Sequence, residues 1–269
     1  MFFRFPYLAA AALCLASCSV IKPAPEQPIR VVVGPMVVEA PVSSASKIHS
    51  FDEKPSPERE PEIRKQLIEE AELKAQRFLT TELAHRHEFT VIPFHDTRRI
   101  FSDISLDGFR PEDRLKALAQ QTDADVVITG RIMAYGQVPL KYWWSTYAVG
   151  EASQIAMVSV LSGGNPIAIG GFLAYDIATD IPAWTGGFHI LGWAYRPVFV
   201  EIEAVRPNCA HPIWTKKQVV IMTYRPLMLL PKEDRWKKEV QLEVNLQHAM
   251  EGVALAAGRS LRLTPCETE

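Results

Sequence analysis

The chain has 269 residues, of which 48% are hydrophobic, and a formal net charge of -2. These values are typical of a globular protein with one sizeable core or two small ones. Because there is no basic excess, charge supports neither a nucleic-acid-binding protein nor electrostatic attachment to a membrane.

The first 17 residues predict a signal peptide. Arg4 supplies a positive start, and the apolar run from Tyr7 to Leu15 ends in small residues. This is the layout of a secretory signal. The run is too short for a membrane-spanning helix, which needs about 20 apolar residues.

The end of this leader, Leu15-Ala16-Ser17-Cys18, resembles the bacterial lipoprotein box. In that class the cysteine thiol is acylated, and the cysteine becomes the first residue of the mature chain. The resemblance implies a signal peptide over 1–17, acyl chains such as palmitate on Cys18, and a proline-rich tether over 18–28. It also implies an outer-membrane lipoprotein that faces the periplasm, because Ser19 stands where an acidic residue would imply retention at the inner membrane. The alternative is a generic signal peptide that happens to contain a cysteine.

The remaining cysteines form one candidate pair. Cys14 lies in the leader and Cys18 is the predicted lipid site, which leaves Cys209 and Cys266. In an oxidising periplasm these two can form a disulfide. The alternative is two separate thiols.

The first half of the mature chain alternates strands and helices. Residues 29–38 are apolar and β-branched, as in a buried strand, and residues 39–57 are typical of a loop. The next elements expected are a helix over 61–86, a strand over 89–94, a helix over 111–122 and a strand over 125–135. This order predicts an α/β unit with neighbouring parallel strands.

The second half has a different pattern. A small-residue-rich apolar stretch, 147–166, predicts a helix, and strand-like runs follow over 167–177, 187–204 and 213–224. Apolar and polar residues alternate from Val198 to Ala204, which is typical of a half-solvated antiparallel strand. A long helix is expected over 232–261. The predicted fold class is α/β with an α+β second half: a mixed sheet with a β-α-β-α-β start, then antiparallel strands and a long C-terminal helix. Residues 29–269 are predicted to form a single periplasmic domain with an insertion near 139–166.

The passage from Leu115 to Ile132 resembles a family of envelope proteins. This family includes the curli-secretion channel lipoprotein, the penicillin-binding-protein activator lipoprotein and the amino-terminal domain of the Tol–Pal propeller protein. Its members have a helix, an acid-flanked turn and a strand with a T/S-G-x-hydrophobic step. Thr122 to Asp125, followed by Val126 to Ile132, matches that layout. Asp176, Thr179 and Trp184 fit the family's next strands, whereas Asp180 replaces the usual turn glycine.

Several clusters could carry chemistry, but none matches an established motif. His85, His87, Glu88, His95 and Asp96 are close in sequence and of the types that bind zinc, yet their spacing fits no zinc pattern. The pairs Gly163-Gly164 and Gly170-Gly171 fit no phosphate loop and are expected at turns or bulges beside strands. We therefore predict no catalytic residue, no metal and no cofactor.

Aromatic residues are frequent in the second half. The candidate interface residues are Trp143, Trp144, Trp193 and Tyr195, with Trp184 and Trp214 nearby in sequence. Aromatic side chains anchor many interfaces, and they also cap cores between sheets and helices.

Taken together, these features favour a non-enzymatic, lipid-anchored envelope protein that acts as a binding, adaptor or assembly component. The expected partners are the outer membrane, through the N-terminal lipid, and either another envelope protein or a second copy. One alternative is an oligomeric export channel that resembles the curli-secretion lipoprotein, with 142–175 and 184–204 entering the membrane. A weaker alternative is a periplasmic hydrolase that uses His95 and Asp96.

Overall fold

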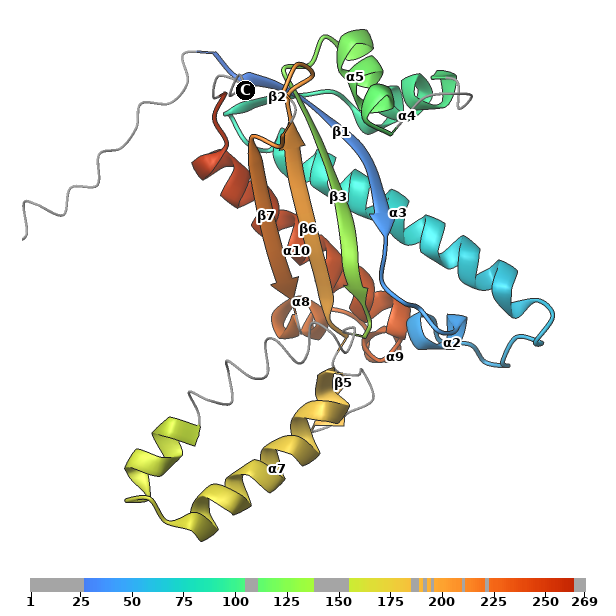
Figure 1. Ribbon diagram of the computed structural model, residues 1–269. Coiled ribbons are helices and arrows are strands. Elements are labelled where there is room, and N and C mark those ends of the chain that lie inside the picture. The colour runs from blue at the N-terminus through green and yellow to red at the C-terminus, as the bar shows by residue number, and fades with distance from the viewer. Residues whose placement is uncertain are drawn as a thin grey trace, which may run out of the picture.

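The core of the protein is a five-stranded mixed sheet (Figure 1). The computed structural model describes residues 27–104, 111–137, 155–184, 189–190, 193–194, 196–209, 211–220 and 223–263. The strands of this sheet, in spatial order, are β2 (Phe89–Val91), β1 (Ile29–Val38), β3 (Val126–Tyr135), β6 (Val198–Val205) and β7 (Trp214–Val220).

One half of the sheet is parallel and the other half is antiparallel. β1 pairs in parallel with both β2 and β3, and β6 pairs antiparallel with β3 and β7. This arrangement confirms the predicted fold class. The alternation along β6 is also confirmed, because every second side chain from Val198 to Ala204 is buried.

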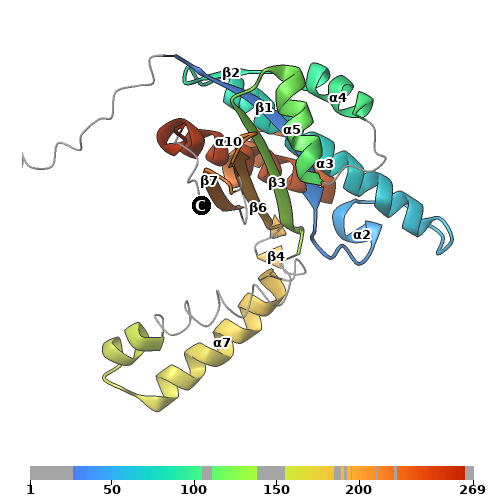
Figure 2. The same ribbon diagram turned by 45° about the horizontal axis from the view of Figure 1, so that its top comes forward.

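Two long helices lie side by side on one face of the sheet (Figures 1 and 2). They are α3 (Glu60–Ala84) and α10 (Lys238–Ser260). The buried stripe of α3 comprises Ala71, Ala75, Leu79 and Leu83. The apolar stripe of α10 comprises Leu242, Leu246, Ala249, Met250, Val253, Ala254 and Ala257. Both stripes join the inward side chains of the sheet in one hydrophobic cluster.

The opposite face is covered only in part by α4 (Phe94–Asp103) and α5 (Pro111–Thr122). These helices pack against β1 and β3 in a smaller cluster around Val32, Leu118 and Val127. The remaining labelled helices are α2 (Ala45–Ile48), α7 (Pro166–Trp184), α8 (Tyr224–Met228) and α9 (Lys232–Arg235).

A bulge in β1 shifts its register with β3 between Val33 and Met36. Two side chains bind the carbonyl oxygens of this segment. The Gln76 side-chain amide of α3 donates to the Val33 carbonyl at 2.8 Å, and the Thr129 hydroxyl of β3 donates to the Pro35 carbonyl at 2.6 Å. The bulge is therefore held from both faces of the sheet.

A helical hairpin leaves the sheet between β3 and β6 and projects from the body (Figure 1). It comprises a helix over 155–161, a turn at Gly163 and Gly164, and α7. Two short strands, β4 (His189–Ile190) and β5 (Trp193–Ala194), pair with each other near its base. None of the helices in the described ranges combines the length and apolar character needed to cross a membrane.

The hairpin overturns three expectations, because Pro166–Trp184 is a single helix, α7. These are the strand over 167–177, the turn or bulge at Gly170-Gly171, and the strand positions of Asp176, Thr179 and Trp184. The β-branched and glycine-rich composition favoured a strand. The competing helix signals stand just before it, where Pro166 occupies the first helical position and the Asn165 side chain accepts a hydrogen bond from the Ile167 amide at 2.9 Å. The turn expected at Gly163-Gly164 is present.

Other elements also differ from the sequence prediction. β2 ends at Val91, and Phe94 begins α4 with Pro93 as its N-cap, where a strand was expected to continue. The C-terminal helix is interrupted between α9 and α10, at Trp236 and Lys237. β6, which the export-channel alternative placed in the membrane, is a strand within the sheet.

Gly130 allows a close approach of β3 and β6. It lies opposite Ile202, and a Cβ at this position would lie 2.8 Å from the Glu201 carbonyl oxygen and would collide with the Ile202 side chain.

We expect Gly130→Ala to lower the free energy of unfolding by about 1–3 kcal/mol, because the backbone of β6 would have to move. Chemical denaturation measures this change. Gly170→Ala is the control, because its Cβ would meet nothing within 4 Å; an equal loss in both variants would contradict the prediction.

Glu72 of α3 accepts a hydrogen bond from the Val38 amide at 2.8 Å. Partial burial raises the pKa of its carboxyl group, and the nearby charge of Glu69 adds to this rise, although the Val38 hydrogen bond acts in the opposite direction. The folded chain therefore holds the Glu72 proton at a higher pH than the unfolded chain does. The carboxyl's contribution to stability is largest below pH 4.5 and is lost as the pH rises through its folded pKa.

We expect Glu72→Gln to remove this pH dependence while keeping an oxygen acceptor for Val38. Near neutral pH the variant should be at least as stable as the parent chain. As the pH falls toward about 4, the parent should gain stability relative to the variant. Denaturant unfolding across this range tests the prediction, with Glu62→Gln on the exposed part of α3 as the control. A constant difference between the parent chain and Glu72→Gln at all pH values would contradict it.

Candidate binding surface

The face of the antiparallel half of the sheet that points away from α10 has no described helix packed over it. We call this surface the open face. It comprises Arg131 of β3, Phe199, Glu201 and Glu203 of β6, and Thr215, Lys217 and Val219 of β7. The Val219 side chain is 46% exposed and that of Lys217 is 63% exposed. Alternation along β6 and β7 produces this face, because their other side chains point toward α10.

A chain of ion pairs crosses the open face. The two carboxylate oxygens of Glu201 lie 3.2 Å from Arg131 Nη2 and 3.1 Å from Lys217 Nζ. Arg131 also lies 3.6 Å from the Glu203 carboxylate and 3.9 Å from that of Glu39. The face therefore presents fixed charges of both signs beside the cross-strand pair of Phe199, which is half-buried, and Val219, which is exposed.

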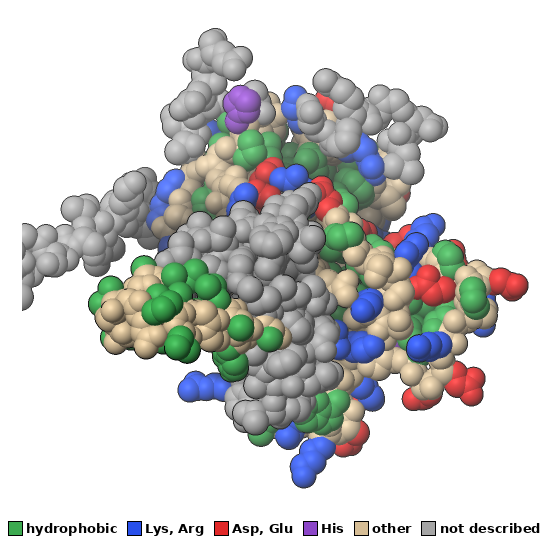
Figure 3. All heavy atoms as spheres, turned by 60° about the horizontal axis from the view of Figure 1, so that its bottom comes forward, with side chains coloured by type: hydrophobic (Ala, Val, Ile, Leu, Met, Phe, Trp, Pro, Cys, Tyr) green, Lys and Arg blue, Asp and Glu red, His purple; other side chains and the backbone are tan. Residues whose placement is uncertain are grey.

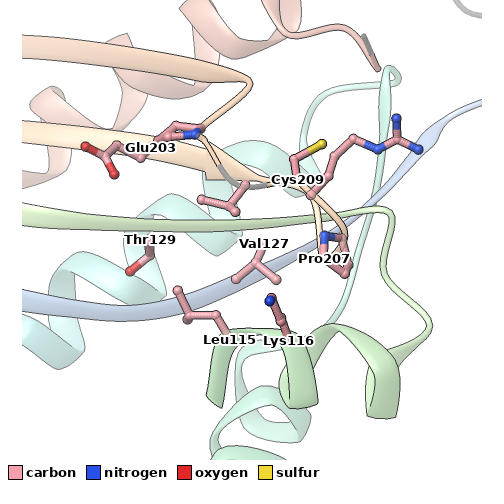
Figure 4. A pocket seen from close by; sticks show the side chains of 10 residues that line it. Leu115, Lys116, Val127, Thr129, Glu203, Pro207 and Cys209 are labelled. Atoms are coloured by element: carbon pink, nitrogen blue, oxygen red, sulfur yellow. The ribbon is translucent and has the colours of Figure 1, made fainter. Parts of the chain in front are cut away.

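The open face leads into a groove of about 270 Å³ at its α5 side (Figure 4). The floor is formed by Val127 and Thr129 of β3 with Glu203 and Val205 of β6. One wall is Leu115 and Lys116 of α5, and the other is the β6–β7 loop, with Arg206, Pro207, Cys209 and Pro212. Most of the lining is apolar, with charged side chains at its margin.

Two polar side chains of the groove already take part in the structure. The Thr129 hydroxyl donates to the Pro35 carbonyl, and Glu203 pairs with Arg131. The groove can therefore accept an apolar side chain from a partner while the open face forms ion pairs with it.

The two edges of the sheet are less suited to strand addition. β2 has only three residues, and β7 carries Lys216 and Lys217. Lysines and short edge strands are common devices against pairing with another strand. The open face is therefore better suited to binding a partner than either edge of the sheet.

The aromatic candidates lie largely outside this surface. Trp143, Trp144 and Tyr195 are outside the described residues, and Trp193 lies in β5 without a described side chain. Trp214 packs against the main core cluster, and its indole nitrogen donates to the Ser260 hydroxyl of α10 at 2.8 Å. Trp214 therefore caps the core, and the role of the other aromatic residues stays a prediction.

The structure describes one of the three cysteines that were predicted to carry a lipid or a disulfide. Cys209 is buried, lines the groove and is disulfide-bonded. Cys266 and the predicted lipid site Cys18 lie outside the described residues. The pairing of Cys209 with Cys266 therefore stays a prediction.

The histidine cluster is not brought together. His85 is the C-cap of α3, whereas His95 lies in the first turn of α4 and its side chain is 87% exposed. The His95 ring lies 3.8 Å from Asp96, whose carboxylate is also 3.6 Å from Arg99. In the part of the chain that the structure describes, no group of three or more His, Cys, Asp or Glu side chains is placed to hold a metal ion.

The charged residues of the open face and of the groove were not predicted as site residues from the sequence. The alternation over 198–204 already predicted that Glu201 and Glu203 share the solvated side of their strand. The same alternation in β7 would have placed Thr215, Lys217 and Val219 on that side. Lys116 and Arg206 carry no such signal, since they meet at the groove only through the tertiary fold.

Comparison with protein-family models and with curated proteins found no match. Among solved structures, similarity was found to lipoprotein GNA1162 from Neisseria meningitidis, with 11% identity, a TM-score of 0.35, and coverage of 72% of this chain and 82% of that one. The LpoB C-terminal domain from Salmonella enterica shows 9% identity and a TM-score of 0.30, over 78% and 91% of the two chains. The hypothetical protein CT253 from Chlamydia trachomatis shows 9% identity and a TM-score of 0.37, over 86% and 96%.

These identities and TM-scores are too low to carry an argument about fold or function. Function is therefore argued below from the residues of this chain.

If Cys209 and Cys266 form one disulfide, Cys266→Ser should lower the free energy of unfolding by about 2–5 kcal/mol. Cys209→Ser and the double variant should show the same loss, because each removes the same bond. Denaturant unfolding of the three variants measures this, and peptide mapping without reductant identifies the linked peptides. Additive losses from the two single variants would contradict the pairing.

Proposed function

We propose that the chain is a lipid-anchored periplasmic protein of the outer membrane that binds another envelope protein without catalysing a reaction. The leader and the box ending in Cys18 support the anchor. The observation that carries the binding role is the open face of the antiparallel strands, which leads directly into the groove beside α5.

The chemistry of this surface suits a protein partner. Ion pairs between Glu201, Arg131 and Lys217 hold charges in fixed positions, and fixed charges give specificity and steer association. The adjoining groove offers an apolar floor for an anchoring side chain, and buried anchors dominate the affinity of many interfaces. Together they provide a polar margin and an apolar centre, the usual composition of such a contact.

The groove is less suited to catalysis than to binding a partner. Its lining contains one hydroxyl group, that of Thr129, which donates to a backbone carbonyl. Its carboxylate, Glu203, is paired with Arg131. The lining therefore presents no nucleophile held by an adjacent base, which covalent catalysis requires.

The binding role predicts that a photoreactive amino acid at Val219 captures one defined envelope protein in cells. Charge reversal by Lys217→Glu should reduce this capture by about fivefold, equivalent to about 1 kcal/mol, because it places like charges beside Glu201 and any acidic partner group. Immunoblotting and mass spectrometry of the crosslinked product provide the measurement.

The matched control is Lys65→Glu on α3, where the lysine is 69% exposed and distant from the open face. This variant should leave the capture unchanged. A probe at Val219 that captures only a second copy of the chain, or no more than a probe placed at Lys65, would refute the proposed partner surface.

A further inference from the structure

The hairpin between β3 and β6 exposes an unusual amount of apolar surface. We call residues 155–175 the apolar hairpin. Its most exposed large side chains are Met157 (59%), Val160 (81%), Leu161 (80%), Ile167 (84%) and Tyr175 (68%). None of its side chains is buried. A helix that is apolar on all sides is typical of a buried or membrane environment, and this one projects from the body.

The apolar hairpin also lacks charge. The sequence has no Asp, Glu, Lys or Arg from Ala152 to Tyr175. Figure 3 shows hydrophobic side chains on the projecting segment, whereas charged side chains lie on the body. A protein partner that received one face of an amphipathic helix would leave the other face polar. The absence of any polar face favours a surrounding that is apolar on every side.

Backbone groups at the tip are bonded within the hairpin. Where the first helix ends, the amides of Ser162, Gly163 and Gly164 donate to the carbonyls of Val158, Val160 and Ser159. At the start of α7, Pro166 has no amide hydrogen, and the Asn165 side chain accepts from Ile167 at 2.9 Å and Ala168 at 3.5 Å. Hydrocarbon offers no hydrogen-bond partners, so internal bonding of this kind is what insertion into lipid requires.

The length of the uncharged part of α7 matches one membrane leaflet. Pro166 to Tyr175 spans about 15 Å at 1.5 Å per residue, which is half of a hydrocarbon core about 30 Å thick. The next residue, Asp176, is the first charged residue of the helix. An inserted tip would therefore reach the midplane while Asp176 stays at the headgroups.

We propose that the apolar hairpin inserts into one leaflet of a lipid bilayer, with the turn at Gly163 and Gly164 near the midplane. This contact goes beyond the proposed partner binding and does not depend on it. The open face lies on the body of the domain, so a membrane-inserted hairpin leaves it free for a protein.

Depth-dependent fluorescence quenching tests the proposal on the full lipidated chain. An environment-sensitive fluorescent amino acid is placed at Leu161, and the protein is reconstituted into vesicles of phosphatidylethanolamine and phosphatidylglycerol. We expect a blue-shifted emission that is largely lost when the lipids carry spin labels near the end of the acyl chains. The same amino acid at Lys65 should show the emission of a water-exposed fluorophore and no quenching, although both proteins carry the same lipid anchor.

Variants at Ile167, which is 84% exposed, separate insertion from folding. Ile167→Asp should weaken the quenching at Leu161 by roughly tenfold or more, because charge is strongly disfavoured near the bilayer centre. Ile167→Val should leave it unchanged. The proposal is overturned if the probe at position 161 shows the emission of a water-exposed fluorophore, or if it is quenched as strongly in Ile167→Asp as in the parent chain. It is also overturned if the blue shift follows protein concentration and is insensitive to spin-labelled lipids, since that result identifies a contact with a second copy.

Discussion

The packing of α3 and α10 against one face of the sheet is the interaction on which the rest of the structure depends. Their apolar stripes meet the inward side chains of β1, β3 and β6 in a single cluster. A polar contact at the edge of this layer joins the helices, where Lys74 Nζ lies 2.7 Å from Glu70 and 2.6 Å from Glu243. Burial lowers the pKa of the Lys74 ammonium, but the hydrogen bonds to these carboxylates outweigh it, so the net pKa is raised.

One-sided burial explains both surfaces proposed for function. With the apolar side chains of β6 directed at α10, their polar neighbours face away and form the open face. The chain returns from the hairpin into β6 at a fixed point, because the buried Asn245 of α10 donates to the Arg196 carbonyl and accepts from the Thr223 hydroxyl, both at 2.7 Å. The apolar hairpin therefore starts from an anchored base at one end of the sheet.

Local sequence signals predicted the continuous apolar run of β1 and the apolar stripe of α3. β1 was predicted with its observed bounds, and α3 begins one residue before and ends two residues before the predicted limits. The prediction failed at α7, where β-branched residues and glycines outweighed the capping residues Asn165 and Pro166. It also failed at Phe94, because only Ile92 and Pro93 separate β2 from α4, and the apolar composition continues across both elements.

The sequence by itself determined the α/β order, the parallel start, the alternation of β6 and the predicted lipid anchor, since each follows from neighbouring residues. Only the tertiary structure decided that α5 and the β6–β7 loop enclose a groove. It also decided that Arg131 pairs with two carboxylates of β6 and with Glu39, which follows β1, and that Lys217 joins Glu201. Those residues come from segments far apart in the chain, and no local periodicity specifies which strands become neighbours. The projection of residues 155–175 was likewise decided by the fold, because an uncharged apolar stretch can be buried in a core as readily as exposed to a membrane.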